Sequence, residues 1–433
     1  MRIERCTWVV AGVGVLVAGL TSASAQSGSQ TRAKIFTGAR LIDGTGKPAV
    51  EKASLLVRDG RVEAVSTPAK AGTGVQVVDL AGKTIIPGLV NAHAHVSDQQ
   101  GTRSGAEFYT EENVARQLGV YARYGVTTLW SLGGDGPVAV KLRDSQDTPS
   151  LARARLYFAG PVITGKTPDL ARQMVAKVAA MKPDVIKIRV DDNLGSGQKM
   201  TPDVYRAVID EAHKLGLRVA VHIYYLDDAK SLLKSGADFI AHSVRDRDVD
   251  DEFISLMKQR DICYCPTFTR ELSTYAYEST PAFFKDPFFR READPEVIRQ
   301  LQEPERQAAM RNNKSAQTYK AQLAVAKRNL KKVADAGVRI AMGTDTGAGP
   351  GRFQGYFEHV ELEMMADAGL TPSQILRAAT GDAAKCMDRA DRVGTLEPGK
   401  WADFIVLDEN PLADIRKTRG VRSVWIAGNE VKR

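Results

Sequence analysis

The sequence has no long run of one kind of residue after its first 25 positions. It contains no block of five or six like charges, and its formal net charge of +8 is spread along 433 residues. This distribution gives no case for nucleic-acid binding. No later apolar run approaches the length of a membrane span, so we expect no span in the mature chain.

Residues 1–25 differ from the rest and have the pattern of a secretory signal peptide. Arg2 and Arg5 flank the start, residues 8–20 are apolar, and Ala-Ser-Ala at 23–25 fits a cleavage site. We expect cleavage after residue 25 and a periplasmic or secreted protein. Cleavage removes one acidic and two basic residues, so the net charge falls from +8 to +7. An uncleaved anchor is the alternative.

Cysteine is scarce, with four residues in the chain. Cys6 leaves with the signal peptide, so Cys263, Cys265 and Cys386 remain. The first two of these lie two apart on a predicted strand, a spacing that strand geometry makes awkward to bridge. Although export permits disulfides, we expect all three thiols to be free and buried.

The two ends of the chain resemble each other and differ from the middle. Residues 33–79 alternate short β-like runs with turn signals such as Asp43-Gly44, and the same style returns at residues 402–429. We therefore expect one small β domain, assembled from residues 26–82 and 391–433.

The middle, residues 83–390, alternates β-like and helical segments. Eight strands with intervening helices are typical of a (β/α)₈ barrel. An open doubly wound sheet is the alternative, but no Gly-x-Gly-x-x-Gly opens a helix after the first strand. The eight strand candidates are residues 84–95, 126–132, 154–162, 185–190, 218–223, 239–242, 262–268 and 338–345.

Residues 269–330 are longer than an ordinary barrel connection. The stretch begins rich in aromatic residues and becomes a charged helix. It is expected to form either a lid over the strand ends or extra helices packed on the flank of the barrel.

Four of the six histidines fall at or just past the C-terminal ends of predicted strands, where barrel enzymes place their chemistry. His93 and His95 end the first strand, and their i, i+2 spacing presents both imidazoles on one face. His222 and His242 end the fifth and sixth strands. Neutral imidazoles converging from strand ends are good ligands for a metal such as zinc.

Two charged residues interrupt apolar strands. Lys187 lies within Val-Ile-Lys-Ile at 185–188, where an unpaired ammonium is costly to bury, and Asp345 ends the last strand. A lysine beside cations is pushed toward its neutral form, and a neutral amine can react with carbon dioxide to give a carbamate. The carbamate would bridge two metal ions through its two oxygens. An aspartate such as Asp345 can bind a metal ion with one carboxylate oxygen and accept a proton with the other.

These motifs together resemble the amidohydrolase superfamily. The resemblance rests on Pro-Gly-Leu-Val-Asn-Ala-His-Ala-His at 87–95, the Lys187 strand, His222, His242 and Gly-Thr-Asp-Thr-Gly at 343–347. Gly-Thr-Leu-Glu-Pro-Gly-Lys-Trp-Ala-Asp-Phe, which ends at Phe404, resembles the family too. The sequence is similar to the imidazolonepropionase-like branch, which includes metal-dependent dipeptidases and amidases. The resemblance implies a (β/α)₈ barrel with a β-sandwich from both termini.

The resemblance also implies a site for two divalent metal ions, expected to be zinc. A carbamate on Lys187 would bridge the ions, and Asp345 would be the catalytic residue that moves a proton from the attacking water to the leaving amine. The other implied ligands are His93, His95 and Asp345 for one ion and His222 and His242 for the other.

Substrate contacts are expected from residues just past these strands, namely Arg189, Tyr224 and Arg245, which would hold a substrate carboxylate or an oxyanion. The sequence departs from the dipeptidase pattern after the second and third strands. Trp130-Ser131 stands where many relatives have Arg-Asp, and Gly-Pro-Val-Ile-Thr-Gly at 160–165 stands where many have Gly-His. Dipeptide specificity is therefore not carried over from the family.

The sequence thus predicts an exported binuclear hydrolase that cleaves an amide or peptide-like C–N bond in a small-molecule substrate such as a dipeptide or N-acyl amino acid. One alternative is a mononuclear deaminase or cyclic-amidine hydrolase, which has no need of Lys187; His359-Val-Glu361 is a formal H-x-E, but no P-C-x-x-C follows. Another is a non-catalytic metal- or solute-binding protein, which does not require Asp345. A homo-oligomer is compatible with the sequence but not specified by it.

Overall fold

The computed structural model describes residues 33–67 and 72–432. The predicted signal peptide and its cleavage site lie outside these residues, so both stay predictions. Within the described residues, no helix is both long enough and apolar enough to cross a membrane.

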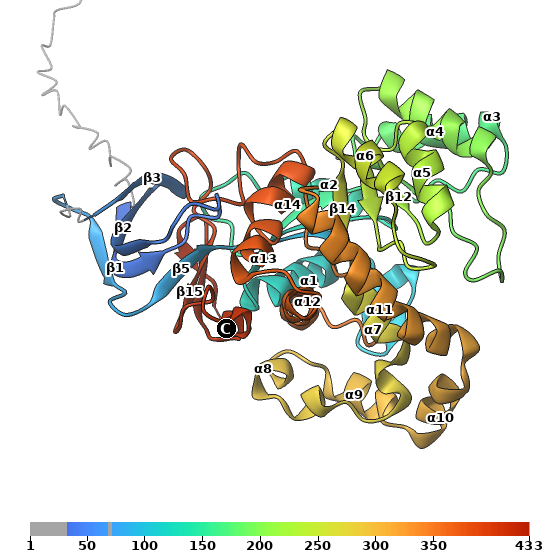
Figure 1. Cartoon of the computed structure of the whole chain (residues 1–433). Coiled ribbons are helices and arrows are strands. Elements are labelled where there is room, and N and C mark those ends of the chain that lie inside the picture. The colour runs from blue at the N-terminus through green and yellow to red at the C-terminus, as the bar shows by residue number, and fades with distance from the viewer. Residues whose placement is uncertain (1–32, 68–71, 433) are drawn as a thin grey trace, which may run out of the picture. The chain divides into compact units, whose positions relative to one another are not determined.

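Strands from both ends of the chain form one mixed eight-stranded sheet (Figure 1). Its order is β17-β16-β15-β5-β1-β2-β3, and β4 pairs with β1. The strands are β1 (Ala33–Leu41), β2 (Val50–Arg58), β3 (Arg61–Ser66), β4 (Gln76–Asp79), β5 (Thr84–Pro87), β15 (Phe404–Leu407), β16 (Val421–Ile426) and β17 (Asn429–Glu430). The two ends therefore share a sheet, as expected for the small β domain. That domain's bounds and its second, facing sheet stay predictions.

Aromatic packing consolidates this sheet across the two ends of the sequence. The ring of Phe36 from β1 lies edge-on to Phe404 from β15, with 4.9 Å between centroids. Trp425 from β16 stacks on Phe404 at 5.8 Å. Because all three rings are buried, the sheet depends on both ends being present.

The prediction of one strand over residues 84–95 is wrong, because the chain changes sheets at Gly88. β5 ends at Pro87 and β6 covers Leu89–Ala94. A Cβ atom on Gly88 would lie 2.0 Å from Oγ1 of Thr127, so only glycine fits there. The mixed sheet thus continues directly into the parallel part of the fold.

Parallel strands carry the middle of the chain, in a three-stranded sheet β10-β9-β6 and a four-stranded sheet β11-β12-β13-β14. Besides β6, these two sheets contain β9 (Val126–Ser131), β10 (Arg155–Phe158), β11 (Ile186–Arg189), β12 (Val219–His222), β13 (Phe239–Ala241) and β14 (Cys263–Cys265), and a separate short pair is formed by β7 (Gln99–Gln100) and β8 (Arg103–Ser104). The helices between them are α1 (Glu111–Arg123), α2 (Pro137–Asp144), α3 (Pro168–Ala179), α4 (Pro202–Lys214), α5 (Leu226–Lys234) and α6 (Asp251–Gln259).

The last predicted strand, residues 338–345, is a single parallel bridge between Ile340 and Tyr264. Its backbone nevertheless reaches β6, since the amide of Ala92 donates to the carbonyl of Met342 at 2.8 Å. Seven regular strands and one bridged segment therefore alternate with helices. Closure of these strands into a (β/α)₈ barrel stays a prediction.

The long segment of residues 269–330 is largely helical, and its aromatic part packs on helix α12 (Tyr356–Asp367) and on the end of α1. Its helices are α7 (Phe268–Tyr275), α8 (Pro287–Arg290), α9 (Pro295–Leu301), α10 (Pro304–Asn312) and α11 (Lys314–Asp335). Three of its aromatic side chains, Tyr277, Phe284 and Phe289, are buried against Tyr124, the residue after α1, and Tyr356 of α12. In Figure 1, α7 and α11 lie beside each other. Most of the insertion is therefore packed helix, while α11 also contacts the site described below.

The expectation of three free cysteines is wrong for two of them. Cys263, which begins β14, forms a disulfide with Cys386, the last residue of α14 (Gly381–Cys386). Their Cα atoms are 5.9 Å apart although the residues are separated by 123 positions. Local spacing rules out a Cys263–Cys265 bond but cannot reveal so distant a partner. Cys265 is free and buried, as expected.

Candidate metal centre

The strand-end histidines and the aspartate meet at one place. His93 and His95 come from the end of β6, and Oδ1 of Asp345 lies 3.4 Å from Nε2 of His93 and 2.8 Å from Nε2 of His95. The backbone places this carboxylate, since the Asp345 amide donates to the His93 carbonyl at 2.7 Å and Asp345 has a φ of 61°. Two imidazole nitrogens and a carboxylate oxygen within 4.8 Å of one another suit a divalent cation.

The other two histidines extend this cluster. The rings of His222, at the end of β12, and His242, just past β13, have centroids 4.1 Å apart. The ring of His242 also lies 4.6 Å from that of His93. The structure therefore brings all four strand-end histidines together in a continuous group.

Hydrogen bonds indicate which ring nitrogen carries a lone pair in two of the histidines, His95 and His222. Nδ1 of His95 lies 3.1 Å from the carbonyl of Gly133, and Nε2 of His222 lies 2.8 Å from Oδ2 of Asp191. Because these oxygens only accept, both nitrogens must donate, which leaves Nε2 of His95 and Nδ1 of His222 as lone-pair nitrogens. A lone pair 2.8 Å from the Asp345 carboxylate is repulsive unless a cation or proton lies between them. The donor set thus fits a metal ion.

His242 has its own partner. Its Nδ1 lies 2.7 Å from the hydroxyl of Thr267, the residue before α7. The nitrogen that Thr267 does not engage is therefore Nε2. Neither Thr267 nor Asp191 is predicted as a site residue from the sequence. The only sequence signal for Asp191 is its position two residues beyond Arg189, at the same strand end.

Lys187 is buried beside the cluster without a partner. Its side chain is 3% exposed, and Nζ has no hydrogen-bond partner among the described residues. Burial lowers the pKa of Lys187 to about 8, with Asp345 opposing the change and Arg189 adding to it. The lowered pKa makes the neutral amine, which is the form that carbamylation requires, more accessible near neutral pH than in an ordinary lysine. An orphaned buried amine therefore fits a group that is added to it.

Burial also sets the charge of the other members. It lowers the pKa of His93 and His242 well below the ordinary value and that of His222 to about 3. Burial alone would raise the pKa of Asp345, but Arg352 and His95 lower it well below its usual range overall. The imidazoles of His93, His222 and His242 are therefore neutral and the Asp345 carboxylate is ionised, which are the metal-binding forms.

Two arginines near the site have no signal in the sequence. Arg352 donates from Nη1 to Oδ2 of Asp345 and from Nε to the hydroxyl of Ser273. Arg270, in the first turn of α7, is 7% exposed, and its Nη1 lies 3.0 Å from Oε2 of Glu271. Both side chains come from segments that follow the last two predicted strands, and both add positive charge beside the histidines.

The three predicted substrate contacts have different surroundings. Arg189 is 41% exposed in its side chain and pairs with Asp191 at 2.7 Å. Tyr224 donates from its hydroxyl to Gln322 of α11, and burial raises its pKa to about 12. Arg245 is fully buried, with Nε 3.2 Å from Glu271, and Tyr224 is also buried, so exposure favours Arg189 as the substrate contact.

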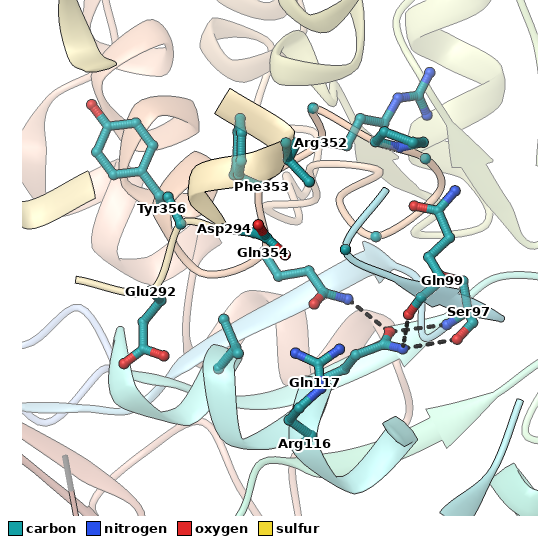
Figure 2. Close-up of a pocket in the computed structure, with 18 of the residues that line it drawn as sticks. Ser97, Gln99, Arg116, Gln117, Glu292, Asp294, Arg352, Phe353, Gln354 and Tyr356 are labelled. Atoms are coloured by element: carbon teal, nitrogen blue, oxygen red, sulfur yellow. Dashed lines mark hydrogen bonds between the residues drawn. The ribbon is translucent and has the colours of Figure 1, made fainter. Parts of the chain in front are cut away.

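A polar pocket lies beside α1 (Figure 2). Gln117 organises it: Nε2 donates to the carbonyl of Ser97 at 2.8 Å, while Oε1 accepts from Gln354 at 3.0 Å. Arg352 lines the pocket, but Figure 2 shows its guanidinium pointing away from Gln117. This arginine thus lies between the pocket and Asp345.

Comparisons with known proteins find sequences that are similar to this chain. Imidazolonepropionase of Deinococcus radiodurans is 24% identical over 88% of this chain and 92% of its own length. Ochratoxinase of Aspergillus niger is 25% identical over 65% of this chain, and an uncharacterised Mycobacterium tuberculosis protein is 28% identical over 52%. These last two matches span 53% and 60% of the relatives' own lengths.

Solved structures share the fold. A candidate prolidase from Bifidobacterium longum is 26% identical, with a TM-score of 0.75 over 93% of this chain and 95% of that one. The crystal structure of Aspergillus niger ochratoxinase has a TM-score of 0.72 over 93% and 96% at 20% identity. The model of the amidohydrolase family matches residues 84–431, which include every residue of the cluster. The chain therefore belongs to the amidohydrolase family.

Proposed function

We propose that the protein is an exported, metal-dependent hydrolase that cleaves an amide or peptide-like C–N bond, built as a (β/α)₈ barrel with a β-sandwich from both termini. The observation that carries the proposal is the buried cluster itself. Four imidazoles, an ionised carboxylate and a lysine amine without a partner among the described residues share one place at the strand ends. That donor set suits two divalent ions, which we propose to be zinc.

The cluster divides into two halves that share Lys187. One ion would be held by His93, His95 and Asp345, the other by His222 and His242, and a carbamate on Lys187 would bridge them. When bound, the ions supply an activated water at neutral pH and polarise the substrate carbonyl.

Asp345 then moves the proton. The water oxygen bonds to the carbonyl carbon, its proton passes to the Asp345 carboxylate, and the C–N bond breaks as Asp345 returns that proton to the leaving nitrogen. The products are a carboxylic acid and an amine. The low pKa of Asp345 keeps it ready to accept the proton across the neutral range.

The charge around the site favours a substrate with a carboxylate. Arg189 offers an exposed guanidinium at the mouth, and Arg270 and Arg352 add positive charge. An N-acyl amino acid or a dipeptide has both the scissile bond and the anionic end. The prolidase and ochratoxinase names of similar proteins support this class.

The mononuclear deaminase alternative receives no support from His359. Its Nε2 lies 2.8 Å from the carbonyl of Tyr124 and its Nδ1 lies 3.1 Å from the hydroxyl of Thr418. Both ring nitrogens are therefore occupied, and burial lowers the pKa of His359 to about 4. We assign His359 a structural role.

Metal analysis tests the proposal directly. We expect about two equivalents of zinc or a similar ion per chain, whereas one equivalent would favour the mononuclear alternative. Lys187→Ala should abolish activity and be partly rescued by added short carboxylates. Lys177→Ala, on α3, is the control, and full activity of Lys187→Ala would contradict the bridge.

Comparing N-acyl amino acids with their carboxyl-amidated forms tests the substrate class. The N-terminal sequence of the exported protein tests cleavage after Ala25.

A further inference from the structure

Helix α12 carries two buried carboxylates that the proposed ligand set does not use. Glu358 and Glu361 are both 0% exposed and lie three residues apart, on one face of the helix. Burying a carboxylate is costly unless hydrogen bonds compensate it. The partners of these two side chains therefore indicate why they are there.

Glu361 holds the turn that leads into α7. Its Oε1 accepts from the amide of Phe268 at 2.7 Å, and its Oε2 accepts from the amide and hydroxyl of Thr269 at 2.7 and 2.8 Å. A helix ordinarily receives such bonds from its own N-cap side chain. Here the N-cap is Thr267, which makes no side-chain cap because its hydroxyl lies on His242 instead. Glu361 thus caps α7 from another helix.

This cap bears on the orientation of His242. Thr267 has a φ of 50°, a left-handed conformation that is unfavourable for a β-branched residue. The bonds from Glu361 to the next two amides hold that conformation, and it aims the Thr267 hydroxyl at Nδ1 of His242. The ring of His242 is therefore positioned by Glu361 through Thr267.

Glu358 makes the matching contacts on the other half of the cluster. Its Oε1 accepts from Nδ2 of Asn91 at 2.6 Å and from the hydroxyls of Thr344 and Thr346 at 3.1 and 2.7 Å. Asn91 in turn accepts from the amide of His93 at 3.0 Å, and the two threonines flank Asp345 in sequence. Glu358 therefore braces the backbone that presents His93 and Asp345.

We propose that Glu358 and Glu361 are positioning residues, each for one half of the metal centre, and that their fixed separation on α12 sets how the two halves face each other. The proposal rests on the two-ion function proposed above. One further contact joins the halves, since the hydroxyl of Thr269 lies 3.1 Å from the carbonyl of Thr344 as well as beside Glu361.

Metal titration of the metal-free full-length protein tests the proposal, with zinc as the probe. Glu361→Gln should weaken the ion held by His222 and His242 by about 10–100-fold in Kd and leave the other ion bound. Glu358→Gln should do the reverse. Glu363→Gln is the matched control, because Glu363 lies on the same helix but pairs with Arg419 away from the site. It should titrate like the wild type.

Double variants identify the half that each glutamate serves. Adding Glu361→Gln to His242→Ala should cause little further loss of zinc affinity, because both changes act on the same ion. Adding Glu361→Gln to His93→Ala should give the sum of the two single-variant losses. Glu358→Gln should show the opposite pattern. If Glu361→Gln does not fold, Thr267→Ala removes only the link to His242 and should weaken the same ion.

Two results would overturn the proposal: equal weakening of both ions by each glutamate variant, or wild-type affinities in Glu361→Gln and Thr267→Ala. A wild type that binds one ion would refute the two-ion function instead. The double variants would still report whether Glu358 couples to His93 rather than to His242, so the two failures are distinguishable.

Discussion

Arg352 donates a hydrogen bond to Oδ2 of Asp345, the carboxylate oxygen that does not face the histidines. The other oxygen, Oδ1, lies 2.8 Å from Nε2 of His95. The two oxygens of the Asp345 carboxylate therefore have different partners: Oδ2 has the guanidinium of Arg352, and Oδ1 has the predicted metal ligand His95. Because a nearby guanidinium favours the ionised form, this pair controls when Asp345 can accept a proton.

Replacing Arg352 should shift the pH dependence of activity. Arg352 lowers the pKa of Asp345, so Arg352→Gln should raise it, and the ionised form will be lost at a higher pH as acid is added. We expect the acid limb of kcat/KM to move up by about 1–3 pH units. Arg328→Gln, which breaks a surface pair with Asp248, is the control. An unmoved acid limb in Arg352→Gln would contradict this role.

Asp191→Asn should weaken the metal centre through His222. The carboxylate fixes the imidazole by accepting from Nε2, and an amide presents a weaker acceptor or a competing donor. Losses of about 10–100-fold in metal affinity or activity are typical for such partners. Asp192→Asn, which alters only the contact with Tyr225, is the neighbouring control. Zinc titration and kcat measured together would show whether both quantities fall.

The disulfide should contribute measurably to stability. Removing a native disulfide typically costs about 2–5 kcal/mol, and Cys263 and Cys386 close a long stretch of chain. A Cys263→Ala, Cys386→Ala variant should therefore unfold at lower urea concentration than the wild type. Reductant should lower the midpoint of the wild type and of Cys265→Ala, but not that of the double variant. A reductant-insensitive wild type would refute the bond.

The ion pair of Arg155 and Asp403 joins the parallel sheet to the C-terminal segment. Nε of Arg155 lies 2.7 Å from Oδ2 of Asp403, and the two side chains are 0% and 3% exposed. Asp403→Asn leaves a buried guanidinium without its counter-charge, so we expect a loss of about 3–5 kcal/mol in urea unfolding. Asp408→Asn, in the exposed pair with Lys83, should cost less than about 1 kcal/mol. Equal losses in the two variants would contradict the argument.

The sequence was most informative where chemistry lies at strand ends. His93, His95, His222 and His242 could be placed together because parallel strands present their C-terminal ends at a common edge, so each ligand follows from its own strand. Lys187 was identifiable because a lysine inside an apolar strand has no ordinary explanation.

Partners that meet only through tertiary packing could not be predicted. Cys386 and Arg352 reach their contacts from segments with no periodic or spacing signal, and Glu361 caps a helix that begins 93 residues earlier. The break at Gly88 was missed for a related reason. Pro87-Gly88 is a local signal for a break, but only the closeness of Thr127 in three dimensions shows why glycine is required there.

The mixed sheet has a consequence for how the chain folds. β5, near the start of the described residues, pairs with β15, so that Ile86 meets Ile405 across more than three hundred residues of intervening chain. Contacts between residues so distant in sequence form late in folding, because the intervening chain must lose conformational entropy before the strand pairing can stabilise the structure. We therefore expect refolding to be slow, with the terminal strands among the last to acquire protection from hydrogen exchange.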